Sequence, residues 1–212
     1  MVPDRELLAG PALVVAPSLL GALLLSTVDG QDVLARVTEV EAYEGGLDPA
    51  SHAFRGRTRR NSVMFGPAGH LYCYFVYGMH WCANIVCGGP DEASAVLLRA
   101  AEIVQGEQFA RQRRTSPMPA ARLASGPARL ARGLGLDGRH TGLDLLNPVS
   151  AVQLLELGSP AAVCSGPRVG VSVAVEHPWR FWLPDEPSVS AYRRGGRPRT
   201  RPPTGAQNRT VR

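Results

Sequence analysis

Residues 70–86 limit the possible folds more than any other part of this chain. They read HLYCYFVYGMHWCANIV, in which two aromatic and aliphatic runs flank the short segment 77–80. Two strand-like runs joined by so short a turn predict a β-hairpin, whose strands are antiparallel. Residues 93–98 form another apolar run and predict a strand that ends in Arg99. Part of the chain is therefore committed to antiparallel sheet.

The predicted hairpin carries side chains that a hydrophobic core does not need. Tyr77 lies at the expected tip, where a large aromatic ring contributes little to packing. Proteins that extrude a base or bend DNA insert such side chains between base pairs. Asn84 is polar within an apolar strand, so it needs a hydrogen-bond partner there, either a backbone group or a ligand.

Residues 32–43, DVLARVTEVEAY, alternate in polarity and are rich in valine, which is typical of a half-buried strand. Alternate residues of a strand share a face, so Glu39, Glu41 and Tyr43 point the same way. Two carboxylates and a tyrosine on one face fit a solvated surface as well as a reaction centre. Glycine and proline at 45–49 then break the strand, and a loop with His52 follows.

A basic and aromatic block surrounds this loop. Eight of the 13 aromatic residues lie between Tyr43 and Trp81, and residues 49–90 contain no acid. Cationic side chains hold phosphates and aromatic faces stack on bases, so the block indicates a nucleic-acid site. The carboxylate of Glu41 just before it indicates chemistry as well. The block has four positive charges, Arg55, Arg57, Arg59 and Arg60.

The formal net charge of +5 is unevenly distributed. Residues 193–212 contain seven arginines and no acid, which leaves sixteen basic and eighteen acidic groups, or −2, on residues 1–192. The last twenty residues are rich in proline, glycine and arginine without apolar periodicity, so we expect a disordered tail. The 44% hydrophobic content of the 212-residue chain suits one core, and we expect a single domain over residues 1–192.

Two absences narrow the chemistry. The chain contains no lysine, which excludes a Schiff base except at the terminal amine. Its four cysteines form no C-x-x-C pair, which argues against structural zinc, and free thiols favour the reducing cytosol.

The apolar run 11–25 has no positive flank and is too short to span a membrane. We expect a buried strand at 13–15 and a short helix capped near Ser18.

The rest of the chain alternates helix and strand signals. Residues 100–114 predict an amphipathic helix, and residues 142–155 and 166–183 predict further strands. Ser125, Gly126 and Pro127 are typical of a helix start, and Gly135 of its end. The free N–H groups of that start can bind a phosphate, or the residues can be an ordinary cap.

Several blocks of the sequence, taken in order, resemble the alkyladenine (3-methyladenine, methylpurine) DNA glycosylase family. The resemblance runs from about Ala9 to Ser190. It implies one mixed α/β (α+β) domain, with a curved, mainly antiparallel sheet, surrounding helices and a protruding β-hairpin, and with no metal or cofactor. The blocks are EVEAYEG, DPASHAFRGRTRRN, MFGPAGHLYCYFVYGMHWCANIV, AVLLRAAE, SGPARL, GPRVGV and PWRFW.

The resemblance also implies a reaction and its residues. Members flip a damaged purine out of duplex DNA and hydrolyse its N-glycosidic bond. Glu41 matches the residue that activates water, while Arg99 and the backbone carbonyl of Val169 match the groups that hold that water. Tyr77 matches the intercalating wedge. The residues that match the walls of the base pocket are Tyr43, His52, Tyr74, Asn84 and Leu97.

One departure from the family pattern concerns the DNA backbone. Arg129 stands where the helix after Ser125 and Gly126 usually carries lysine, and it can still neutralise a phosphate with a different geometry. The resemblance implies a monomer that binds double-stranded DNA and no membrane, in the cytoplasm and at the nucleoid while bound. Lack of lysine implies a monofunctional enzyme, which leaves an abasic site and does not cut the strand.

Two rival classes remain open from the sequence. A non-catalytic nucleic-acid-binding module explains the basic and aromatic residues but not Glu41 among them. A hydrolase or transferase that acts on free nucleosides or RNA keeps the carboxylate but has no use for a wedge at Tyr77. Duplex DNA with one hypoxanthine or ethenoadenine distinguishes these classes, because only a DNA glycosylase makes an alkali-labile site in it.

The arginine-rich tail gives a first testable prediction. Each phosphate that a protein neutralises adds about 0.9 to the slope of log affinity against log salt concentration. If about half of the tail arginines engage, deletion of residues 193–212 lowers this slope by roughly 3 and weakens non-specific DNA binding at low salt. Single-turnover excision at saturating protein stays nearly unchanged. Identical slopes for the full and truncated chains would leave the tail without a role in DNA binding.

Overall fold

The strands expected from residues 70–99 lie side by side in the computed structural model, which describes residues 3–196. β3 (Leu71–Val76) and β4 (His80–Cys87) form the hairpin, and β5 (Ser94–Gln105) pairs with β4. β5 does not end at Arg99, and the helix predicted over residues 100–114 is wrong. Within residues 100–114, only α3 (Glu107–Gln112) is helical. The reason is tertiary: Ala100 and Ala101 are buried opposite β2, where backbone pairing prevails over the helix propensity of alanine.

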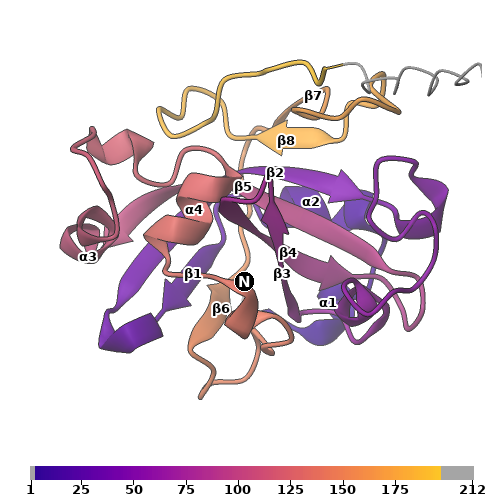
Figure 1. Cartoon of the computed structure of the whole chain (residues 1–212), viewed down its shortest axis with the longest axis horizontal. Helices are drawn as coiled ribbons and strands as arrows, with labels where there is room; N and C mark the ends of the chain where they lie inside the picture. The colour runs from indigo at the N-terminus through magenta and orange to yellow at the C-terminus, as the bar shows by residue number, and fades with distance from the viewer. Residues whose placement is uncertain (1–2, 197–212) are drawn as a thin grey trace, which may run out of the picture.

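The predicted strand at residues 32–43 forms β2 (Val33–Tyr43), around which the sheet is built. β5 pairs with β2 along one edge. The other edge is shared between β1 (Leu23–Ser26) and β8 (Arg180–Trp182). β6 (Val152–Glu156) extends the sheet beyond β1, and β7 (Cys164–Gly166) pairs with β8. The eight described strands form one sheet in which every pairing is antiparallel (Figure 1).

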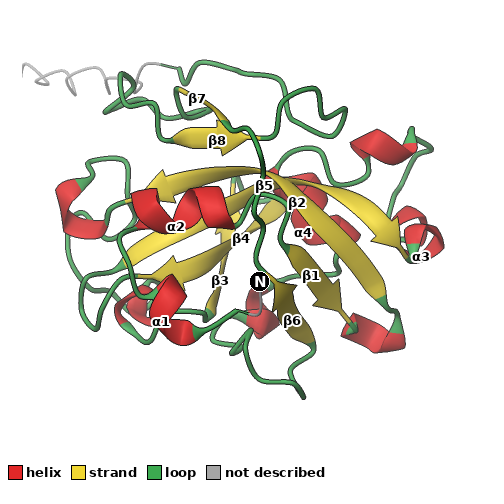
Figure 2. Cartoon of the chain, turned by 180° about the vertical axis from the view of Figure 1, so that it is seen from behind, coloured by secondary structure: helices red, strands yellow, loops and turns green. Residues whose placement is uncertain are grey.

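Helices cover both faces of this sheet. α4 (Pro127–Gly133) packs on β4 and β5, while α2 (Ala12–Ser18) packs on β2 and β5. α1 (Arg5–Leu8) and α2 lie on the face opposite α4, as the two views show (Figures 1 and 2). Short 3₁₀ turns lie in the connections. The expected mixed α/β fold with a mainly antiparallel sheet is therefore confirmed. The 3₁₀ turns are Val28–Gly30, Gly45–Leu47, Ser62–Phe65, Ala120–Arg122 and Gly138–His140.

Two further segments differ from expectation. The strand predicted at residues 13–15 is part of α2, because apolar residues at helical spacing, Ala12, Val15 and Ala16, are buried on one side. Ser18 ends this helix and does not cap its start; its Oγ donates to the Val15 carbonyl at 2.8 Å. The strands predicted at residues 142–155 and 166–183 shorten to β6 and β8, and residues 167–179 form no strand.

The start of α4 follows the sequence signals. Gly126 precedes the helix, Pro127 is its first residue, and Gly135 follows its end with a φ of +73°. None of the helices in the described part of the chain is long and apolar enough to cross a membrane.

Most of the expected tail lies outside the described residues. Of residues 193–212, the structure describes only 193–196. Here the Arg193 carbonyl accepts a hydrogen bond from the Gly170 N–H at 3.0 Å. Deletion of residues 193–212 removes this contact with Gly170, whereas a truncation after Gly196 leaves it in place.

Close backbone packing at the end of β6 gives a prediction about stability. A Cβ atom at Gly158 would lie 1.6 Å from the carbonyl oxygen of Leu20. We expect Gly158→Ala to lower the free energy of unfolding by about 3 kcal/mol or more, as an overpacked core site does. Gly46→Ala is the matched control, because nothing lies within 4 Å of its Cβ position. Thermal unfolding checks both, and equal midpoints would contradict the assigned clash.

Candidate active site

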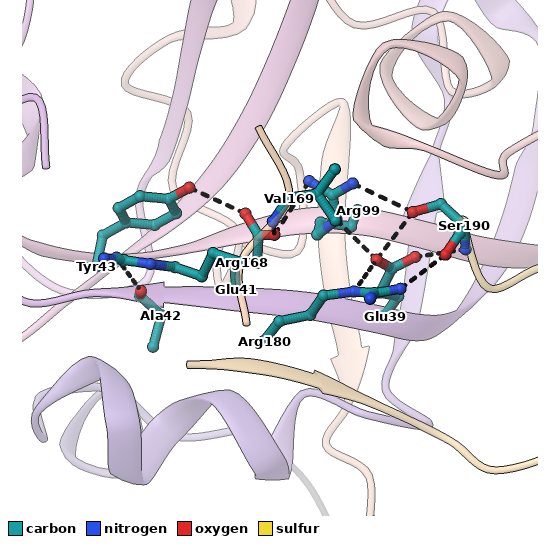
Figure 3. A network of polar contacts seen from close by, with 9 residues as sticks. All are labelled: Glu39, Glu41, Ala42, Tyr43, Arg99, Arg168, Val169, Arg180 and Ser190. Carbon is teal, nitrogen blue, oxygen red and sulfur yellow. Dashed lines mark hydrogen bonds and ion pairs between the residues drawn. The ribbon is translucent and has the colours of Figure 1, made fainter. Parts of the chain in front are cut away.

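Two carboxylates at the end of β2 are completely buried. Glu39 and Glu41 are each 0% exposed. Both contact Arg99 of β5: its Nε donates to Glu39 Oε1 at 2.7 Å, and its Nη1 lies 3.2 Å from Glu41 Oε1 (Figure 3). The strand face that the sequence assigned to both residues is confirmed, and the alternative of a solvated surface is wrong. Regular pairing with β5 is interrupted on both sides of Glu39, which bends the strand at this point.

The oxygens of Glu39 are fully engaged. Oε1 accepts hydrogen bonds from Arg99, Arg180 and Ser190, and Oε2 accepts one from the Ser190 N–H at 2.6 Å. Burial alone would raise the pKa of Glu39. The charges of Arg99 and Arg180, with the Ser190 N–H, outweigh burial and hold that pKa below its ordinary value. Glu39 therefore stays ionised as part of the scaffold.

Glu41 is in the opposite electrostatic situation. Its Oε1 accepts from the Val169 N–H at 2.6 Å, and its Oε2 accepts from the Tyr43 hydroxyl at 2.9 Å. Burial raises the pKa of Glu41, and these hydrogen bonds together with Arg99 offset only part of the effect. The two neighbouring carboxylates thus have opposite pKa shifts, and Glu41 accepts a proton more readily than Glu39 does.

Arg168 supports Tyr43 from one side. It is 1% exposed, and its guanidinium carbon lies 4.6 Å from the centre of the Tyr43 ring and 4.9 Å from that of Trp179. It also donates to the carboxylate of Asp48 and to the Ala42 carbonyl. Because the cation is held by these bonds, the ring of Tyr43 rests against a fixed plane.

A cavity of about 560 Å³ opens beside these groups and is lined by residues from β2, β3, β5, α4 and the loop at 169–173. A smaller cavity of about 60 Å³ shares Tyr43, His52 and Tyr74 with it and adds Asn84. The structure thus brings together most of the residues that the sequence singled out. Those in the wall of the large cavity are Glu41, Tyr43, His52, Tyr74, Tyr77, Leu97, Arg99, Ser125, Gly126, Arg129 and Val169.

Aromatic and amide groups line the smaller cavity. The His52 ring meets Tyr74 edge-on at 4.5 Å, and its Nδ1 lies 3.2 Å from the Tyr72 hydroxyl. Burial and the charge of Arg60 lower the pKa of His52, which favours the neutral imidazole. Asn84 is 5% exposed, and its Nδ2 donates to the Tyr72 carbonyl at 3.0 Å. Its partner is thus a backbone group, and its side chain still borders the cavity.

The hairpin tip presents Tyr77 to solvent. The side chain is 81% exposed, and its backbone has a φ of +53°. A bulky residue rarely adopts this left-handed conformation, which costs about 1–3 kcal/mol and persists mainly where function needs it. Tyr77 also lines the large cavity, so the exposed ring lies at the cavity mouth.

The residues expected to contact the DNA backbone divide into two groups. Arg55, Arg57, Arg59 and Arg60 are exposed on their loop and do not line the large cavity. At the start of α4, by contrast, the buried Ser125 hydroxyl has no hydrogen-bond partner among the described atoms and lies in the cavity wall.

The sequence did not identify several residues that hold Tyr43 and Glu39 in place. Arg168 lies in the block GPRVGV, where an arginine among apolar residues signals a buried ion pair, but its partner Asp48 is 120 positions away. Arg180 and Ser190 gave no comparable signal. Val169 was expected to act through its carbonyl, whereas the contact observed with Glu41 comes from its N–H. No group of three or more His, Cys, Asp or Glu side chains in residues 3–196 is placed to hold a metal ion.

Comparison with known proteins identifies the family. A family model described as methylpurine-DNA glycosylase (MPG) matches residues 6–187. The chain belongs to this family. It is therefore a DNA glycosylase, a hydrolase of the N-glycosidic bond that works in DNA repair, and DNA is its partner. This excludes a non-catalytic binding module and an enzyme of free nucleosides.

Relatives named as 3-methyladenine DNA glycosylases match nearly the whole chain. The protein from Streptomyces avermitilis is 52% identical over 193 residues, which cover 89% of this chain and 91% of the relative. That from Leifsonia xyli is 51% identical over 91% of this chain and 93% of its own. That from Mycobacterium tuberculosis is 48% identical over 92% and 96%.

The opposite pKa shifts in the glycosylase predict opposite effects of pH on stability. Because the pKa of Glu41 is raised above its ordinary 4.5, its favourable contribution to folding is lost as pH rises through the folded pKa. We expect Glu41→Gln to be at least as stable as the wild type at pH 8. The difference in stability between the two proteins should shrink towards pH 4.5.

Glu39→Gln is the matched control, for which we expect a change in stability of the opposite sign. The pKa of Glu39 is lowered from 4.5, so its contribution is present above that value and is lost as pH falls through the folded pKa. This variant should be less stable than the wild type at neutral pH, and the difference should shrink in acid. Thermal unfolding midpoints measured across pH check both, and shifts of the same sign would contradict the assignment.

Proposed function

We propose that this glycosylase excises alkylated and deaminated purines from double-stranded DNA with a water molecule activated by Glu41. The substrates are of the 3-methyladenine, 7-methylguanine, hypoxanthine and ethenoadenine class, and the product is an abasic site. The observation that carries the proposal is a buried carboxylate of raised pKa in the wall of a cavity that also has aromatic sides.

The reaction needs one group that handles a proton and a positive charge. Water attacks C1′ of the deoxyribose through an oxocarbenium-like transition state. Glu41 takes the proton of that water and stabilises the developing cation. The Val169 N–H and the Tyr43 hydroxyl hold its two oxygens, so the carboxylate keeps one orientation. Arg99 and the carbonyl of Val169 are proposed to bind the water.

The base pocket is proposed to recognise the lesion by stacking and by exclusion. Tyr43, His52 and Tyr74 offer aromatic surfaces to the cavities. A cationic base such as 7-methylguanine gains roughly 0.5–2 kcal/mol from each such contact and leaves without a general acid. A neutral His52 does not repel that base. Leu97 lines the wall, and Asn84 obstructs the exocyclic amine of undamaged guanine.

The surface around the cavity is proposed to hold the DNA. Tyr77 enters the duplex as a wedge and occupies the space of the flipped nucleotide. The exposed arginines at 55, 57, 59 and 60 neutralise phosphates on one side. The start of α4, with Ser125, Gly126 and Arg129, holds phosphates on the other. The enzyme works as a monomer in the cytoplasm, at the nucleoid while bound to DNA, and its four cysteines form no disulfide.

The enzyme is proposed to be monofunctional. A glycosylase that also cuts the strand needs an amine to form a Schiff base with the sugar. The chain has no lysine to supply one. The product of the reaction is therefore an intact strand with an abasic site.

Replacement of Glu41 tests the proposal. Glu41→Gln should keep binding of duplex DNA with one hypoxanthine, while the single-turnover rate of base release falls by at least about 10², the range for a general base. Alkali-labile sites measure release, and a binding isotherm measures affinity. Glu39→Gln, which alters the contacts to Arg99, Arg180 and Ser190 but leaves Glu41 in place, should lose less.

Two results would contradict the proposal. A Glu41→Gln protein with more than half of the wild-type rate would remove Glu41 from the mechanism. Strand breaks that appear without alkali would show that the enzyme is not monofunctional.

A further inference from the structure

The last described segment passes close to the catalytic centre. After β8, the Ser188 hydroxyl lies 2.8 Å from the Thr38 hydroxyl at the bend of β2, and both side chains are buried. Two residues later, the Ser190 N–H donates to Glu39. Both serines lie beyond residues 6–187, which the family model matches. A segment outside the matched region thus reaches the buried carboxylates.

Ser190 connects the charges of this centre. Its hydroxyl accepts from Arg99 Nη2 at 3.1 Å and donates to Glu39 Oε1 at 2.9 Å. Its carbonyl accepts from Arg180 Nη2 at 2.7 Å. One serine therefore contacts two guanidinium groups and a carboxylate, as Figure 3 shows.

These contacts determine where Arg99 points. A guanidinium is planar, and its Nε and Nη2 donors lie along one edge. Glu39 binds the Nε and Ser190 binds the Nη2, so both donors of that edge are engaged. The remaining nitrogen, Nη1, is then directed towards Glu41 at 3.2 Å. Without the Ser190 hydroxyl, only the bond to Glu39 holds this edge of Arg99, and the guanidinium plane can rotate about that bond.

We infer that Ser190 is a positioning residue for base excision, which together with Glu39 fixes Arg99 so that its Nη1 faces Glu41. The inference rests on the proposed role of Glu41. Glu41 lines the cavity and Glu39 does not, so the part of Glu39 is also to hold Arg99. Ser190 acts only through Arg99 and is not itself a catalytic residue.

A matched pair of serines separates this role from simple anchoring of the segment. Ser190→Ala should slow single-turnover excision of hypoxanthine about tenfold, the effect of one lost hydrogen bond to a charged group. Its dissociation constant for the lesion duplex should stay within about twofold, because Ser190 does not line the cavity. Ser188→Ala removes a hydroxyl contact of the same segment and should keep the wild-type rate. Ser190→Thr restores a hydroxyl and should recover most of the activity.

Thermal unfolding of the same variants controls for folding. We expect Ser190→Ala to lower the midpoint more than Ser188→Ala, since the Ser190 hydroxyl bonds two charged groups and the Ser188 hydroxyl bonds one neutral hydroxyl. If both also slow excision by the same factor, the segment is only an anchor and the inference is overturned. A wild-type rate for Ser190→Ala overturns it as well.

A double-mutant cycle tests whether Ser190 acts through Arg99. In an Arg99→Lys background the edge that Ser190 holds no longer exists, so adding Ser190→Ala should change the rate less than about twofold. Independent, multiplicative effects would overturn the inference. That failure is distinct from failure of the proposed function, because it leaves the loss of activity in Glu41→Gln intact.

Discussion

The site depends on one guanidinium group placed between two buried carboxylates. Two negative charges two residues apart on a strand, both hidden from water, would strongly oppose folding without compensation. Arg99 approaches both from the adjacent strand and stays protonated, because the carboxylates raise its pKa more than burial lowers it. Arg180 adds a second cation to one side only. Burial raises the pKa of both carboxylates; with two cations beside it Glu39 has a lowered pKa, whereas burial prevails at Glu41 and its pKa stays raised.

The sheet topology explains how that asymmetry arises. β2 has β5 along one edge, while its other edge passes from β1 to β8. The bend at Glu39 lies where this change of neighbour occurs, and β8 contributes Arg180 opposite Glu41 in the register. The change of neighbour brings β8, and with it Arg180, to this part of β2. The chemistry of the site therefore follows from a strand that changes partner halfway along its length.

The parts of this structure that local pattern determines could be predicted from the sequence. The hairpin, the presence of the strand β2, the exposed tip at Tyr77 and the start of α4 each depend on neighbouring residues. The half-buried alternation predicted for β2 holds only over residues 33–36, because residues 37–42 are all buried. The helical course of residues 12–18 and the length of β5 could not be predicted, because packing against β2 decides both. The site divides in the same way. Glu41 and Tyr43 belong to one strand, whereas the partners Asp48 with Arg168, and Glu39 with Ser190, meet only after folding.

The conformation of the hairpin tip has a consequence for how the enzyme would search DNA. Tyr77 is already extended into solvent in a strained, left-handed backbone, so the wedge is presented before any duplex arrives. With the wedge role proposed here, every base pair that the protein passes meets the same preformed ring. The barrier to entry is then set by the DNA, and it is lowest where a lesion has weakened pairing or stacking. Damage would thus be sorted first by how readily a pair opens, ahead of any contact within the pocket.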